Sequence, residues 1–183
     1  MAKKLPKIIS QEEFEQLFAA ASKLEKKTKS ATSKLQVKKY RIAMLLGFEA
    51  GMRISEIVGW LDRVPPLSKE NIDDASIRIL SGKGGKDRIV PRPRRLNQAA
   101  IDMLPLDINR RSLQHFITRL GMKVLGKEIS FHTFRHGFVT HLVNSGRPLH
   151  EVQMLAGHSR LDTTGIYLHA NPKKAIDGAR EVF

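Results

Sequence analysis

Six side chains of four chemical types are spread along the chain and could together act on a phosphate group. They are Arg53, Lys83, His132, Arg135, His158 and Tyr167. Guanidiniums donate paired N–H groups to phosphate oxygens, imidazoles and amines move protons, and an activated phenol attacks an electrophilic atom. These are the groups needed to cleave a phosphodiester without a metal ion.

His132 and Arg135 lie three residues apart, so on a helix they project from the same side. The pair alone fits a basic surface at the start of a capped helix equally well. His136 stands four residues after His132, a spacing at which two histidines can share a zinc ion. No glutamate follows His132 as in the metalloprotease signature, so we expect no metal site. We interpret His136 and His141 as structural or exposed residues.

The chain of 183 residues is long enough for one domain and is strongly basic, with a formal net charge of +14. Such an excess favours a polyanion as partner, nucleic acid first, although a lysine-rich solvated surface is the alternative. The absence of cysteine excludes disulfides and thiolate catalysis. It fits an intracellular protein, and we expect a cytoplasmic, nucleoid-associated one. No segment approaches the roughly 18 apolar residues of a membrane span, so we expect no membrane partner.

Lys83 lies in the glycine-rich run 82–86, between two short alternating segments at 76–80 and 87–90. Glycines let the backbone approach a ligand closely, and a lysine there can reach into a groove. The alternative is a hairpin tip that its lysines keep solvated. Cationic residues follow, opposed only by Asp87, and we expect them to contact phosphates rather than to read bases. They are Lys86, Arg88, Arg92, Arg94 and Arg95.

Apolar periodicity predicts a mainly helical α+β fold with a small antiparallel β-hairpin. Ser10 and Glu13 have capping-box spacing at the start of the first helix, and residues 26–34 are interpreted as a loop or a frayed helix end. The segment between Arg95 and Ser112 is short for a third strand. We expect further helices at about 35–50, 53–60, 113–124, 130–144, 148–157 and 171–183.

Five motifs in this order resemble those of the catalytic domain of the tyrosine recombinases, the family of phage integrases and Xer-type resolvases. Each motif is weak alone, whereas all five at sensible spacing are specific. The resemblance runs from about Lys7 to Phe183. The motifs are 51–57 with Arg53, 82–86 with Lys83, His132-x-x-Arg135, 155–159 with His158, and 163–169 with Tyr167.

The resemblance implies a transesterification of DNA. Tyr167 would form a 3′-phosphotyrosyl bond, which a 5′-hydroxyl of a partner strand later reverses. Because the phosphoester energy is kept in the covalent link, no cofactor, metal ion or ATP is implied. A tyrosine has an ordinary pKa of about 10, so Tyr167 needs a base and a cationic setting. His132 is our candidate base, and Lys83 is our candidate acid for the leaving 5′-hydroxyl.

The two arginines are expected to hold the non-bridging oxygens of the phosphate under attack. Paired N–H groups on a planar guanidinium suit these oxygens better than an ammonium does, and both Arg53 and Arg135 can offer them. His158 would add a further donor. Glu56 follows Arg53 by three residues and either orients Arg53 or is an ordinary helix-surface carboxylate.

We expect residues 1–9 to form an arm, 10–170 the catalytic domain, and 171–183 a helix that can contact another protomer. The N-terminal core-binding domain usual in the family is expected to be absent. DNA binding should therefore be weak and strongly salt-dependent. We expect a monomer in free solution and a tetramer on paired double-stranded DNA sites. Two alternatives are a type IB topoisomerase-like relaxation of DNA and a non-catalytic basic DNA-binding protein.

Overall fold

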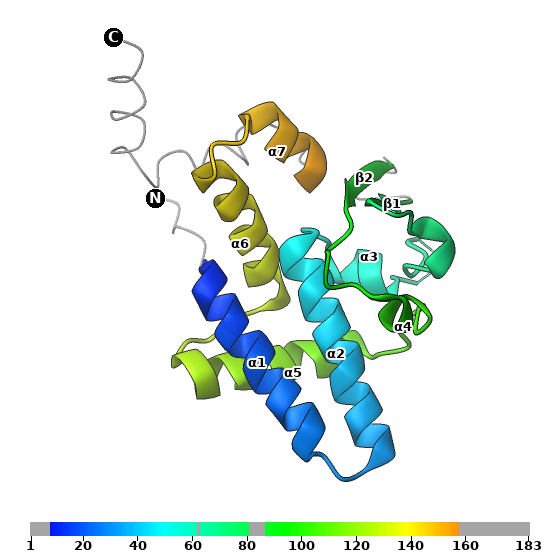
Figure 1. Ribbon diagram of the computed structural model, residues 1–183, viewed down its shortest axis with the longest axis vertical. Helices are drawn as coiled ribbons and strands as arrows, with labels where there is room; N and C mark the ends of the chain where they lie inside the picture. Colours follow the sequence, from blue (N-terminus) through cyan, green and yellow to red (C-terminus); the bar gives the residue numbers. More distant parts are fainter. Residues whose placement is uncertain (1–7, 62, 81–86, 158–183) are drawn as a thin grey trace.

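The computed structural model combines a group of helices with a two-stranded antiparallel sheet (Figure 1). It describes residues 8–61, 63–80 and 87–157. Within these ranges, no helix combines the length and the apolar character needed to cross a membrane. The elements are α1 (Gln11–Lys27), α2 (Ala31–Glu49), α3 (Ile54–Val58), the 3-10 helix η1 (Lys69–Asn71), β1 (Ser76–Ile79), β2 (Arg88–Pro91), α4 (Gln98–Ile101), α5 (Arg110–Leu125), α6 (Phe131–Asn144) and α7 (Leu149–Ala156). The predicted fold class, mainly helical with a small antiparallel sheet, is confirmed.

Serine caps set the first two helix starts. In the predicted capping box of α1, Glu13 N donates to Ser10 Oγ at 3.2 Å and Ser10 N donates to Glu13 Oε2 at 3.1 Å. The predicted loop at 26–34 is wrong in its second half. Ser30 Oγ accepts from the backbone N–H of Ser33, and α2 begins directly after this cap. The helix therefore starts four residues before the position expected from apolar periodicity.

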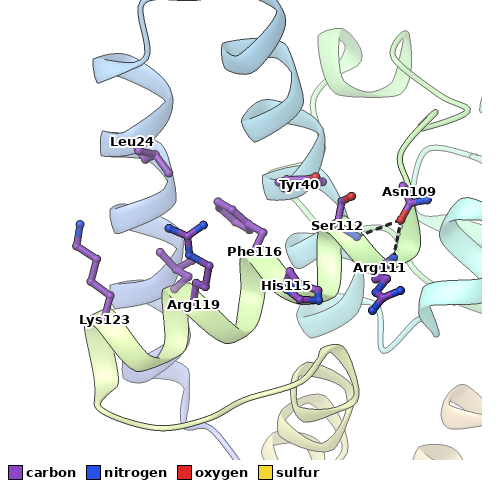
Figure 2. A pocket seen from close by; sticks show the side chains of 10 residues that line it. Leu24, Tyr40, Asn109, Arg111, Ser112, His115, Phe116, Arg119 and Lys123 are labelled. Carbon is purple, nitrogen blue, oxygen red and sulfur yellow. Dashed lines mark hydrogen bonds between the residues drawn. The ribbon is translucent and has the colours of Figure 1, made fainter.

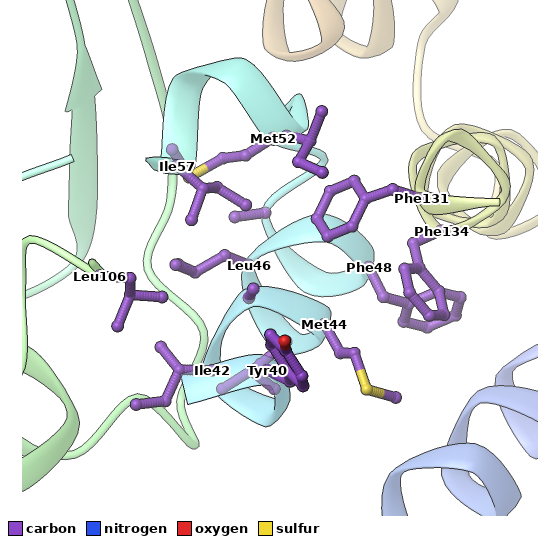
Figure 3. Packing of buried hydrophobic residues seen from close by; sticks show 14 of the residues in the cluster. Tyr40, Ile42, Met44, Leu46, Phe48, Met52, Ile57, Leu106, Phe131 and Phe134 are labelled. Atoms are coloured by element: carbon purple, nitrogen blue, oxygen red, sulfur yellow. The ribbon is translucent and has the colours of Figure 1, made fainter. Parts of the chain in front are cut away.

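Aromatic rings join α1, α2 and α6 in the core. Phe14 stacks on Phe48 with ring centroids 4.0 Å apart, and Phe134 meets Phe14 edge-on at 5.8 Å. Figure 3 shows Phe131 and Phe134 of α6 directed toward the apolar side chains of α2. All four rings are buried. Their burial fixes the rotation of α6 about its axis, and this determines where the neighbouring His132 and Arg135 are carried.

The sheet pairs Ser76 with Pro91 and Ile79 with Arg88. Ile77, Ile79 and Val90 are buried and anchor its inner face. The residues after β2 lead into the short helix α4, so in the described part of the chain the sheet stays a hairpin, as expected. Arg88 is the first residue of β2, and its side chain reaches Leu155 of α7, the helix that contacts this strand.

Gly51, after the end of α2, is required by both backbone and packing. Its φ of +61° is left-handed, and a Cβ atom there would lie 2.3 Å from Phe138 Cδ1. We expect Gly51→Ala to lower the free energy of unfolding by about 1–3 kcal/mol more than Gly126→Ala does, because overpacking costs that amount. Gly126 is a matched control, with a φ of +64° and no atom within 4 Å of its added Cβ. Equal losses in urea denaturation would contradict this placement of Phe138.

Candidate active site

Arg53 is the N-cap residue of α3, and Glu56 is its partner one turn later. The Glu56 carboxylate accepts from the backbone N–H of Arg53 at 2.7 Å and from Arg53 Nη1 at 2.7 Å. Arg53 Nη2 also donates to the carbonyl oxygen of Gly157 at 3.3 Å. The same carboxylate thus caps the helix and orients the guanidinium, which is 16% exposed in its side chain.

Arg88 reaches Glu56 from the sheet. Its Nη1 and Nη2 donate to the two carboxylate oxygens at 2.7 and 2.8 Å, and its Nε donates to the carbonyl oxygen of Leu155 at 3.0 Å. A Cβ atom at Gly157 would lie 2.8 Å from Arg88 Cδ, so this glycine makes room for the arginine. The Arg88 side chain is only 7% exposed. In place of the expected phosphate contact, the structure gives Arg88 a buried ion pair that ties β2 to α3 and α7.

Glu56 is 3% exposed, unlike an ordinary helix-surface carboxylate. Burial alone would raise the pKa of its carboxyl group, but the hydrogen bonds and charge of Arg88, with those of Arg53, lower the pKa to about 2. The carboxylate therefore stays ionised at neutral pH. It holds two arginines from separate elements in fixed positions.

Arg135 lies on the buried side of α6 and is 6% exposed. Its Nη1 donates to the carbonyl oxygen of Gly51 at 2.5 Å, and its Nη2 donates to the carbonyl oxygen of Ala156. Arg53 and Arg135 therefore bond to the carbonyls of successive residues at the end of α7. They also meet at the turn 51–53, because Arg53 is its last residue and Arg135 bonds to its first. The structure brings these two predicted guanidiniums together.

His132 occupies the first turn of α6 with an exposed side chain. Partial desolvation and the nearby charge of Arg135 lower the pKa of its imidazole, and Arg53 and Arg110 act in the same direction. His132 is thus held largely neutral at neutral pH, as an acceptor of a proton must be. Half-buried His136 also has a lowered pKa, caused by burial and then by His132 and Arg135. Across the described ranges, no three His, Asp or Glu residues gather as metal ligands.

His132 is expected to titrate below the ordinary histidine pKa of about 6.5. Arg110→Ala removes one of the positive charges acting on it, so the pKa of His132 should rise. NMR titration of the histidine ring protons measures this directly. Lys26→Ala, at the far end of α1, removes the same charge as a control and should leave the titration unchanged. An unaltered His132 pKa in Arg110→Ala would contradict the proximity of the two residues.

Four predicted site residues, Lys83, Lys86, His158 and Tyr167, lie outside the described residues. The remaining expected phosphate contacts have different surroundings. Arg94 is exposed, whereas Arg92 donates to the carbonyl oxygens of Asp73 at 3.3 Å and of Leu96 at 3.0 Å.

Arg95 forms ion pairs with Glu15 and Glu49 and lies 4.7 Å from the ring centroid of Phe18. The charge of its guanidinium is therefore already balanced by carboxylates on α1 and at the end of α2, and it does not need a DNA phosphate as a partner.

A row of basic residues on α5 was not identified from the sequence, although its regular four-residue spacing is a readable signal. These residues line a surface groove of about 740 Å³ between α1, α2 and α5, which Tyr40 and Phe116 also line (Figure 2). All of them are exposed. They are Arg111, His115, Arg119 and Lys123. The groove contains none of the predicted catalytic residues.

Known proteins match this chain in sequence. The family model described as the phage integrase family matches residues 105–174. The chain is 33% identical over 191 residues to the tyrosine recombinase XerD of Pseudomonas aeruginosa, an alignment that covers 92% of this chain and 59% of that protein. The chain thus spans less than two thirds of the length of this curated relative.

Solved structures share the fold. The XerH site-specific recombinase, in a post-cleavage complex with a palindromic difH substrate, is similar with a TM-score of 0.71 and 21% identity, over 96% of this chain and 53% of that one. The catalytic domain of bacteriophage HP1 integrase is similar with a TM-score of 0.58 and 19% identity, over 94% of this chain and 93% of that domain. The ordered motifs, the related sequences and the shared fold show that the chain belongs to the tyrosine recombinase family and holds its catalytic domain.

Proposed function

We propose that this chain cleaves and rejoins double-stranded DNA as the catalytic part of a site-specific recombinase or integrase. One observation carries the proposal. Arg53 and Arg135 come from separate elements and meet at the carbonyls of Ala156 and Gly157, directly before His158 in the sequence. Two guanidiniums fixed side by side form a receptor for the two non-bridging oxygens of one phosphate. The net charge of +14 adds a general attraction for DNA.

In the proposed reaction, the phenolic oxygen of Tyr167 attacks phosphorus and the bond from phosphorus to the 5′-oxygen breaks. The phenol proton passes to His132, and Lys83 gives a proton to the departing 5′-oxygen. Arg53, Arg135 and His158 stabilise the added negative charge on the phosphate oxygens. A 5′-hydroxyl then attacks the 3′-phosphotyrosyl bond and restores the diester. One ester bond replaces another at each step, so neither ATP nor a metal ion enters the scheme.

The chain offers a matched control for the nucleophile because it has two tyrosines. Tyr40 is 7% exposed and packs against Phe116, with ring centroids 4.8 Å apart, so its ring is held in the packing between α2 and α5. The test uses a pool of nicked duplexes of randomised sequence. Cleavage near the nick releases a short fragment that diffuses away, so the reaction cannot be reversed and any covalent protein–DNA adduct is trapped. We expect adducts with the unaltered chain and with Tyr40→Phe in the presence of EDTA.

Tyr167→Phe is expected to form no adduct while its DNA binding in a mobility-shift assay stays nearly unchanged. An adduct with this variant would show that the nucleophile is assigned to the wrong residue. No adduct with the unaltered chain on any sequence of the pool would favour a non-catalytic DNA-binding protein.

We also propose that the chain is a monomer in free solution and associates, as a tetramer, only on paired DNA sites. A two-site recombination assay beside a plasmid relaxation assay separates this function from a type IB topoisomerase-like one. Recombinant products between two copies of the selected site are expected. Relaxation without recombinants would favour the topoisomerase-like reaction.

A further inference from the structure

Arg110 and Trp60 form a pair at the edge of the candidate active site. The guanidinium carbon of Arg110 lies 3.8 Å from the centroid of the Trp60 ring. Trp60 follows α3 and is fixed by its backbone N–H, which donates to the carbonyl oxygen of Val64 at 2.9 Å. The residue is still 43% exposed. A planar guanidinium on an indole face is held in orientation while its edge remains available to a ligand.

Arg110 is partly buried and has no carboxylate partner among the described residues, in contrast to four other arginines. Arg41, Arg53, Arg88 and Arg95 each form an ion pair with a glutamate. No such pair is formed by Arg110 within residues 8–61, 63–80 and 87–157, and its buried Nε has no hydrogen-bond partner. Burial lowers the pKa of its guanidinium, which nevertheless stays charged. A cation that is held in place without a counter-ion is suited to an anion from outside the chain.

The position of Arg110 links it to the two arginines described above. Its charge acts on His132 together with those of Arg53 and Arg135, and α5 contacts α3. The backbone N–H groups of Arg111 and Ser112, in the first turn of α5, are already used, since both donate to Asn109 Oδ1 (Figure 2). The guanidinium of Arg110, rather than the helix end, is therefore the group that a ligand would meet.

We propose that Arg110, held against Trp60, binds a DNA phosphate next to the one that Arg53 and Arg135 receive. This inference rests on the proposed function. A duplex presents successive phosphates along each strand, so a receptor for one phosphate needs a second contact to fix the direction of the strand. The Arg110–Trp60 pair would supply that contact and would place the scissile phosphate relative to the attacking residue.

The first test measures the salt dependence of binding to the site selected from the pool. Each phosphate neutralised by the protein contributes about 0.9 to the slope of log K against log salt concentration. Arg110→Ala is expected to reduce the slope by about that amount. Lys26→Ala removes one exposed charge from the last turn of α1 and is expected to leave the slope unchanged. An unchanged slope in Arg110→Ala would overturn the proposal.

Trp60 tests whether the aromatic face matters. Trp60→Phe keeps an aromatic surface under the guanidinium and is expected to retain most of the slope, whereas Trp60→Ala should lower it toward that of Arg110→Ala. Equal binding by Trp60→Ala and the unaltered chain would contradict a role for the ring. Trp60 is the single tryptophan of the chain, so its fluorescence should change when DNA is added, and less so in Arg110→Ala.

The second test identifies the phosphate. Duplexes that carry one uncharged methylphosphonate at a defined position are compared for the unaltered chain and for Arg110→Ala. We expect the substitution beside the scissile phosphate to weaken binding of the unaltered chain and to have no further effect on Arg110→Ala. If the methylphosphonate at every position weakens DNA binding by both proteins equally, the Arg110–Trp60 pair only stabilises the packing of α5 against the turn after α3, and the proposal is wrong. The proposed function is tested separately, because the unaltered chain should form the covalent adduct whether or not Arg110 binds a phosphate.

Discussion

Arg53→Ala is expected to slow DNA cleavage by about 10²–10³-fold, the loss typical for removal of one donor aimed at a developing negative charge. Arg53 is the more accessible of the two neighbouring arginines, since it is partly buried whereas Arg135 is buried. The rate is measured as single-turnover adduct formation on the nicked substrate. Arg53→Lys keeps the charge but loses the planar pair of donors, so it is expected to restore only a small part of the rate.

The loss in Arg53→Ala should come from the reaction and not from unfolding. Arg88 keeps both of its hydrogen bonds to Glu56 in this variant, so the buried carboxylate does not lose all of its positive charge. Arg41→Ala serves as a control that removes a glutamate-paired arginine on α2, away from the candidate site. We expect it to cleave at the normal rate. Cleavage by Arg53→Ala within a few-fold of the unaltered chain would contradict its assignment as a phosphate receptor.

Arg88→Ala is expected to lower the free energy of unfolding by about 3–5 kcal/mol, the usual cost of removing one partner of a buried ion pair. Glu56, which is 3% exposed in the unaltered chain, would be left with Arg53 alone, and the carbonyl oxygen of Leu155 would lose its donor. Since α7 and α3 are joined through this arginine, DNA cleavage should fall as well. Urea denaturation and the adduct assay measure the two effects.

A double substitution measures the coupling between Arg88 and Glu56. Arg88→Ala with Glu56→Ala removes the unpaired buried charge, so the combined loss of stability should be smaller than the sum of the two single losses. Additive losses would contradict the coupling seen in the hydrogen bonds. Activity should not return in the double variant, because Arg53 then lacks the carboxylate that orients it.

The pH dependence of stability reports on the same carboxylate. The pKa of Glu56 is lowered from an ordinary value of 4.5 to about 2, so its contribution is fully present above about pH 5 and is lost as the pH falls toward 2. The difference between these pKa values corresponds to about 3 kcal/mol. Glu56→Gln cannot ionise and should lack this part of the acid dependence. Parallel stability curves for both proteins between pH 5 and pH 2 would contradict the burial of a charged Glu56.

Local signals predicted most of the secondary structure. The capping box at Ser10 and Glu13 marks the start of α1 correctly, because both partners stand within one turn of each other. The start of α2 was missed since residues 31–34 carry no apolar pattern, and only the cap at Ser30 reveals it. The short helix α4 was missed for a similar reason, as its four residues hold only about one period of the helical pattern.

Long-range pairing limited what could be predicted of the site. Arg88 stands among several cations in the sequence, and nothing near it shows that its partner is Glu56, 32 residues earlier. Charge alone therefore favoured a phosphate contact. The pairing of Arg110 with Trp60 was invisible for the same reason, because α3 and α5 come together only in the folded chain. The motif at 51–57, by contrast, holds Arg53 and Glu56 within one helical turn, where spacing suggests contact.

The most direct test of the proposed chemistry is to identify the residue that carries the DNA. The covalent adduct is digested first with nuclease and then with protease, and its peptides are sequenced by mass spectrometry. We predict a nucleotide joined through its 3′-phosphate to Tyr167, with Tyr40 unmodified. A nucleotide on any other residue, or one linked through a 5′-phosphate, would contradict the mechanism.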